Sequence, residues 1–135
     1  MTIDTFKRDL QRGEDIEQHA LKIIQEKYPD AYKIRGYCKE GDIFIPSINK
    51  GIEIKYDPMS KKTGNIVVEI EFGGKPSALS TTKAYRWFFY TGDSIIITSP
   101  DRLEQLIKDN NLYPATFTGR GDSKSKRAFL IKKHL

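Results

Sequence analysis

The residues of this chain best suited to chemistry are two acids and a lysine between positions 42 and 55. Asp42 begins an apolar run, and Glu53 and Lys55 lie two residues apart in Gly51-Ile-Glu-Ile-Lys-Tyr-Asp57. That second run alternates apolar and polar residues, as a half-buried strand does, so Glu53 and Lys55 project from one face. A carboxylate can bind a hard cation, and a neighbouring ammonium can hold water or offset phosphate charge. These residues therefore indicate a metal-dependent phosphodiesterase site.

The segment between the two runs predicts how Asp42 reaches the other residues. Asn49-Lys50-Gly51 is a turn signal, and a two-residue hairpin loop at 49–50 places Asp42 on the face of Glu53 and Lys55. In that register Glu53 lies opposite Pro46, about 13 Å along the strand from Asp42. The two acids can then share an ion only if the ribbon bends, and Pro46 is the expected place for the bend. The alternative is that Glu53 and Lys55 decorate the solvent face of an ordinary strand.

Hydrophobic periodicity predicts the elements that must position these residues. Residues 14–28 have helical spacing, Ser80 is a candidate N-cap for a helix whose Ala84, Trp87 and Phe88 face the core, and Ser99-Pro100 opens a last helix to about residue 108. Strands are expected at 31–37, 42–48, 51–57, 66–72 and 94–98, and a terminal hairpin at 116–118 and 128–131. The order α-β-β-β-(β)-α-β predicts an α/β fold, a single domain with a mixed β-sheet flanked by helices.

Further acids could complete a site at the edge of this sheet. Glu17 borders the apolar stripe of the first helix, whereas Glu14 lies nearer the expected helix end, where the helix dipole alone favours acids. We therefore favour Glu17 over Glu14. Asp57 and Glu69 would join the cluster if their strands lie beside the Glu53 strand, but either could simply be exposed.

Asp42, the Glu53-Ile54-Lys55 triplet and the preceding helix with Glu17 together resemble the PD-(D/E)XK nuclease superfamily, in particular small phage-type endonucleases and Holliday-junction resolvases. The resemblance covers roughly residues 13–98 and departs from the literal motif because Gly41 stands where the motif has proline. It implies a restriction-endonuclease-like core. It also implies that Asp42, Glu53 and Glu17 bind Mg²⁺ or Mn²⁺, and that Lys55 assists the attacking water.

The distribution of charge indicates a polyanionic partner. The net charge is +5, and residues 116–135 hold this whole excess, so the rest of the chain is neutral. A basic segment on a neutral body is typical of nucleic-acid binding, although a solvated tail has the same composition. The candidate DNA contacts lie in the loop after residue 57, in the glycine-rich stretch after residue 73 and in the basic segment: Lys61, Lys62, Lys75, Ser77, Lys83, Arg120, Lys124, Lys126 and Arg127.

Length and composition exclude several other classes. A chain of 135 residues is one domain, and its 38% of hydrophobic residues argue against disorder. No run approaches the roughly 20 apolar residues of a membrane span, so no membrane association is expected. The lone Cys38 suits a reducing compartment, and we expect a cytoplasmic protein.

Two functions remain open from the sequence. The first is a metal-dependent DNA endonuclease acting on duplex or branched DNA, and the second is a nucleic-acid-binding module that keeps the fold without turnover. Because two strand cuts require two sites, we expect a homodimer. Its contacts would come from the segment around Trp87 and Phe88 or from the terminal hairpin around Phe129 and Leu130.

Overall fold

The computed structural model describes residues 3–118 and 124–135. Three α-helices and nine strands occur in these ranges, with short 3-10 turns at Pro46–Ile48 and Ala78–Ser80. The helices are α1 (Ile3–Lys27), α2 (Ser60–Thr63) and α3 (Pro100–Asp109). The strands are β1 (Tyr32–Lys33), β2 (Ile43–Ile45), β3 (Lys50–Tyr56), β4 (Asn65–Phe72), β5 (Lys75–Pro76), β6 (Arg86–Tyr90), β7 (Ile95–Thr98), β8 (Ala115–Phe117) and β9 (Lys126–Lys132). Among the described helices, none is long and apolar enough to cross a membrane.

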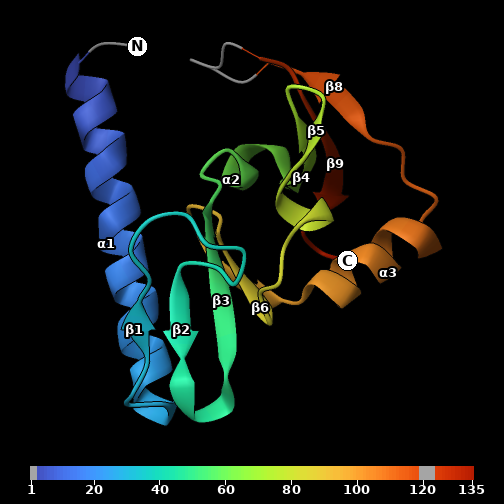
Figure 1. Cartoon of the computed structure of the whole chain (residues 1–135). Helices are drawn as coiled ribbons and strands as arrows, with labels where there is room; N and C mark the ends of the chain where they lie inside the picture. Colours follow the sequence, from blue (N-terminus) through green and yellow to red (C-terminus); the bar gives the residue numbers. More distant parts are fainter. Residues whose placement is uncertain (1–2, 119–123) are drawn as a thin grey trace.

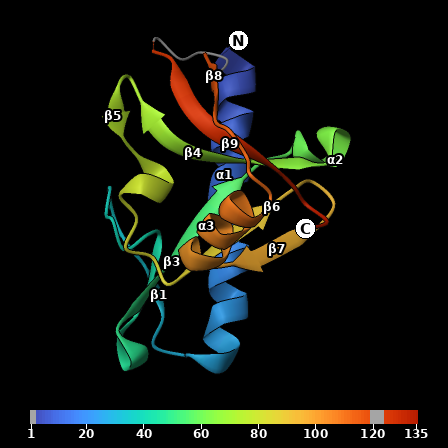
Figure 2. The same cartoon turned by 90° about the vertical axis from the view of Figure 1, so that its right-hand side faces the viewer.

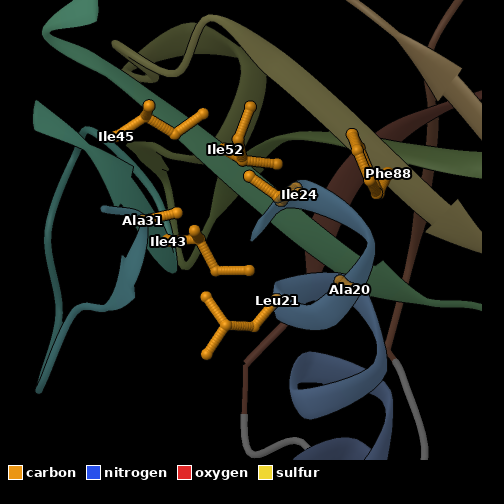
Figure 3. Close-up of a cluster of buried hydrophobic side chains, with 8 residues drawn as sticks. All are labelled: Ala20, Leu21, Ile24, Ala31, Ile43, Ile45, Ile52 and Phe88. Atoms are coloured by element: carbon orange, nitrogen blue, oxygen red, sulfur yellow. The ribbon is translucent and has the colours of Figure 1, made fainter. Parts of the chain in front are cut away.

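The first sheet has the strand order β1-β2-β3-β6-β7, with β3 and β6 parallel and the other neighbours antiparallel. Helix α1 lies along one face of this sheet (Figure 1). A buried apolar cluster joins them, in which α1 contributes Ala20, Leu21 and Ile24 (Figure 3). The sheet contributes Ile43, Ile45, Ile52 and Phe88 to the same cluster, so the even positions of β3 face the helix.

The second sheet has the order β5-β4-β9-β8 and is antiparallel throughout. It lies on the side of the first sheet away from α1, together with α3 (Figures 1 and 2). A second buried cluster fills this side and contains Trp87 and Phe89 of β6, Leu103 of α3, Val68 of β4 and Ile131 of β9. Strand β6 is therefore covered on both faces, and it connects the two cores.

The predicted α/β class is confirmed, but the expected single sheet with a helix after the fourth strand is wrong. Residues 86–90 form a central strand, not a helix, and Ser80 ends a 3-10 turn, where its hydroxyl donates to the carbonyl of Ile70 at 2.7 Å. Aromatic residues favour strands, and burial on both faces removes the alternation that would have revealed one. The chain passes from β3 to β6 through α2, β4, β5 and the second 3-10 turn.

Several other boundaries follow the prediction more closely. Ser99 caps α3 by accepting the N–H of Arg102 at 3.2 Å, and β8 pairs with β9 as the expected terminal hairpin. The strand predicted at 94–98 is β7 (Ile95–Thr98), an edge strand on which Ile97 is 57% exposed. The helix expected at 14–28 begins as early as Ile3.

Candidate active site

Strand β3 holds Glu53 and Lys55 on the face directed away from α1. The ammonium of Lys55 lies 3.2 Å from Glu53 Oε1 and 5.4 Å from the centre of the Trp87 ring. Ile52 belongs to the cluster under α1, so the alternation along β3 separates the charged residues from that core. The predicted sharing of one face by Glu53 and Lys55 is confirmed.

Asp42 reaches this pair by a route that differs from the predicted hairpin. The connection from β2 to β3 is the turn Pro46–Ile48 followed by Asn49 in the left-handed conformation, and Ile43 pairs with Ile52. Glu53 therefore does not lie opposite Pro46, and the next position of the ladder brings Asp42 beside Glu53 instead. The bend expected at Pro46 occurs at the end of β2. Proline has no N–H to donate to a neighbouring strand, and the chain leaves the sheet there.

The carboxylate of Asp42 lies at the edge of β3, between the two faces of the sheet. Its Oδ2 accepts the backbone N–H of Ile54 at 2.7 Å, and its own N–H donates to the carbonyl of Ile52 at 2.8 Å. Because the N–H groups of a strand point in the plane of the sheet, this carboxylate takes the place of a β2 ladder partner. It can consequently interact with groups on either side of the sheet.

The backbone conformation of Gly41, the residue before Asp42, excludes a proline at this position. Its φ is +121°, which proline cannot adopt, and a side chain there would clash with the backbone carbonyl of Ile52. Gly51 is constrained in a similar way, because a side chain would clash with the carbonyl of Glu40. These two close approaches fold the loop before Asp42 onto β3.

Asp42 is the acid whose titration is changed most clearly by its surroundings. The pKa of its carboxyl group is raised to about 6, mainly by burial and also by the negative charges of Glu53 and Glu17, against the opposing effects of the Ile54 N–H and Lys55. A carboxylate whose pKa is raised by neighbouring acids lies where negative charge accumulates. The other two acids favoured by the sequence thus act electrostatically on Asp42.

Glu17 approaches Asp42 from the α1 side of the sheet. It lies in the middle of the helix, as does Glu14, so the dipole at a helix start does not account for either residue. The Glu17 carboxylate lies 3.2 Å from the ammonium of Lys33, and Glu14 is exposed. Lys33 was not predicted as a site residue. Its ion pair with Glu17 depends on the pairing of β1 with β2, and a strand of two residues is too short to be predicted from its sequence pattern.

The carboxylates fit a hard divalent cation in charge and donor type, although they do not form a complete cage. No three His, Cys, Asp or Glu side chains within residues 3–118 and 124–135 are grouped as a ready metal site. Asp42 and Glu53 nevertheless supply carboxylates on neighbouring segments, and the negative charge of Glu53 is one cause of the raised pKa of Asp42, so a cation would interact favourably with both. Mg²⁺ commonly uses one or two protein carboxylates and keeps several waters.

The two secondary acids lie elsewhere. Asp57 accepts the backbone N–H of Val67 at 3.0 Å and so holds the start of β4. Glu69 belongs to the second sheet, where its carboxylate accepts the Ser77 hydroxyl at 2.7 Å and lies 3.7 Å from Lys126 Nζ. The condition under which Glu69 would join Glu53 is not met, because β3 pairs with β2 and β6 and not with β4.

The candidate DNA contacts fall into separate groups. Strand pairing brings Phe72 beside both Lys75 and Lys126, and the side chain of Lys124 lies against Gly73, so one end of the second sheet is basic. Arg127 lies 3.8 Å from Glu71, and Ser77 is held by Glu69. The remaining candidates are Lys61 and Lys62 on α2, Lys83 in the loop before β6, and Arg120, which lies outside the described residues.

Comparison of the chain with protein-family models, with curated proteins and with solved structures finds no match.

Proposed function

We propose that this protein is a metal-dependent endonuclease that hydrolyses phosphodiester bonds in DNA, with a preference for branched structures. The observation that carries the proposal is the convergence of Asp42 and Glu53 at one point of the sheet with Lys55 3.2 Å from Glu53. Like charges on neighbouring strands destabilise a sheet, so such a convergence has a structural cost. A cation bound between the two carboxylates would offset this repulsion, and a cation-dependent reaction would explain why the acids lie there.

Each residue has a separate part in this proposal. Asp42 and Glu53 would hold the Mg²⁺ or Mn²⁺ ion, with Glu17 available from the α1 side. When bound, the ion supplies Lewis-acid stabilisation of charge on phosphate oxygens. Lys55 is oriented by Glu53 and by the Trp87 ring, and it would position the attacking water and help it lose a proton.

The test is incubation with linear duplex, nicked duplex and four-way-junction DNA, with and without Mg²⁺, followed by analysis of the products on denaturing gels. We expect Mg²⁺-dependent cleavage that is fastest on the junction. Glu53→Gln should reduce the rate on the order of 10²-fold or more, because it removes a metal ligand. Glu71→Gln is the matched control: this glutamate is similarly half-buried but lies in the second sheet beside Arg127.

The alternative is a nucleic-acid-binding module that does not turn over. Two observations favour it: the Glu17 carboxylate contacts Lys33, and the described acids do not form a group of three ligands. Binding of DNA without Mg²⁺-dependent cleavage, in a preparation of the folded full chain, would select this alternative over the nuclease.

We also propose that the active form is a homodimer, because two cuts in a junction need two sites. Trp87 and Phe88 are buried and do not offer the contact surface expected from the sequence. Leu130 is 46% exposed and pairs across strands with Val67, which is 36% exposed, so the hairpin remains the candidate surface. Light scattering should give twice the chain mass of 15.5 kDa, and Leu130→Lys should shift it towards the monomer.

A further inference from the structure

A cavity of about 560 Å³ opens beside the candidate active site, at the turn between β2 and β3. Phe44 and Gly51 line it and pair directly with each other. Glu53 lies two residues beyond Gly51 on the same face of β3, at a spacing of about 7 Å along a strand. The cavity and the carboxylate pair therefore lie on one side of the sheet, where the carbonyl of Glu40 packs over Gly51. The volume of the cavity falls within the range of small-molecule binding sites.

Aromatic rings form one wall of this cavity. The rings of Tyr32 and Phe44 lie 6.0 Å apart between their centres and are tilted by 59°, and both residues line the cavity. Tyr32 is 51% exposed. A large aromatic side chain left half-open at the mouth of a cavity offers a face on which a flat ring can stack.

Positive charge surrounds the same opening. Arg35, Lys50 and Lys83 line the cavity from three different segments of the chain. The one acid of the lining, Glu40, accepts the Cys38 thiol at 2.9 Å. The lining therefore has three positively charged side chains and one carboxylate, which favours an anionic ligand.

We propose that this cavity takes one unpaired nucleotide of the DNA substrate. The base would stack against Tyr32 and Phe44, and the adjoining phosphates would lie beside the three cations. Aromatic stacking with basic flanks is how proteins bind single-stranded nucleic acid without reading its sequence. This inference rests on the proposed function, since it takes DNA as the ligand.

The position of the cavity gives it a role in substrate choice. A nucleotide held in the cavity would lie beside the loop whose Glu40 carbonyl covers Gly51, and the next phosphate of its strand would lie across this loop towards Asp42 and Glu53. A fully paired duplex has no base free to enter, whereas a bulge, a flap or a junction has one. Preference for branched DNA then follows from an unpaired base beside the scissile bond, with no long recognition surface.

The experiment measures binding without cleavage, in EDTA, using the full chain. The probes are a duplex with a single-nucleotide bulge that carries 2-aminopurine and the same duplex fully paired. We expect tighter binding of the bulged probe and quenching of its fluorescence on binding. Tyr32→Ala should weaken the bulged complex at least about fivefold and abolish the quenching. Tyr113→Ala, which removes a tyrosine that is 88% exposed and lies outside the cavity, should change neither quantity.

Equal affinity for the two probes, no binding to either, or an unchanged Tyr32→Ala variant would overturn the cavity assignment. Addition of Mg²⁺ to the same samples separates this result from the proposed function. Binding with quenching but no cleavage keeps the cavity and rejects the nuclease. Cleavage without quenching keeps the nuclease and rejects the cavity.

Discussion

The two sheets of this protein differ in how completely the charges of their acidic residues are compensated. In the second sheet, Glu71 pairs across strands with Arg127, and Glu69 lies near Lys126 and Ser77. Opposite charges on neighbouring strands stabilise a sheet modestly. In the first sheet Asp42 lies beside Glu53, another acid, and within the electrostatic influence of Glu17. Charge compensation accounts for Glu69 and Glu71 of the second sheet, whereas Asp42 of the first sheet carries a cost of burial and of neighbouring negative charge that a bound cation would relieve.

Lys55 sharpens this difference. It lies 3.2 Å from Glu53, and Lys33 lies 3.2 Å from Glu17, yet the pKa of Asp42 stays raised against the attraction of Lys55. An ion pair at a half-exposed position contributes little to stability, so Lys55 is not expected to be there for the fold. The cation–π contact with the Trp87 ring instead holds the Lys55 ammonium next to the carboxylates.

The largest predicted effect tests the packing that joins the two sheets. Phe89 of β6 is fully buried in the second cluster. Phe89→Ala should lower the free energy of unfolding by about 3–5 kcal/mol, because it leaves a cavity between the sheets. Urea denaturation measures this change. Ile97→Ala, at an exposed position of β7, should cost far less, and equal losses in the two variants would contradict the assignment of β6 as the shared core.

The next prediction separates metal binding from the chemical step. Lys55→Ala should reduce the rate of DNA cleavage on the order of 10²-fold, because the water loses its positioning group. Affinity for Mg²⁺ should stay the same or increase, since Glu53 loses its cationic neighbour. Cleavage kinetics over a range of Mg²⁺ concentrations distinguish the two effects. A rate restored by higher Mg²⁺ would make Lys55 a contributor to metal binding instead.

The raised pKa of Asp42 predicts a specific dependence of stability on pH in metal-free protein. In the folded chain the proton is bound more tightly than in the unfolded chain, so stability falls as pH rises from about 4 to about 6. The fall is at most about 3 kcal/mol and smaller if solvent screens the charge. Asp42→Asn should lose this part of the pH dependence and be more stable at pH 7. Identical pH profiles by urea unfolding would refute the electrostatic cost at Asp42.

The smallest effect concerns the basic end of the second sheet. Combined Lys75→Ala and Lys124→Ala should weaken all DNA substrates alike and lower the slope of log K against log salt by up to about 0.9 per lost contact. Arg127→Ala should change the slope less, because Arg127 lies beside Glu71. Salt titrations of DNA binding test this order, and an unaffected slope in the double variant would reduce the group to solvated charge.

The sequence pattern correctly predicted features that depend only on neighbouring residues, such as strand alternation and helix capping. Alternation placed Glu53 and Lys55 on one face of β3, and Ser99-Pro100 marked the start of α3. The strand at 86–90 was missed because Trp87, Phe88 and Phe89 are all buried, and a strand covered on both faces has no alternation to detect. Spacing in that run matched a helix equally well.

The rest of the site depends on contacts between distant segments. The approach of Asp42 to Glu53 depends on the positive φ of Gly41 and on the turn at Pro46–Ile48. Neither feature allows the pairing register of β2 with β3 to be predicted from the sequence. The cavity at Tyr32 and Phe44 had one available signal: Phe44 lies two residues from Asp42 and so shares its side of the strand.

The most direct test of the difference between the sheets is calorimetric titration of the protein with Mg²⁺. We predict binding by the wild-type chain, a loss of at least about tenfold in affinity for both Asp42→Asn and Glu53→Gln, and no change for Glu71→Gln. Absence of binding to the wild-type chain, or equal affinity in all four proteins, would contradict the claim that the acids of the first sheet form a cation site.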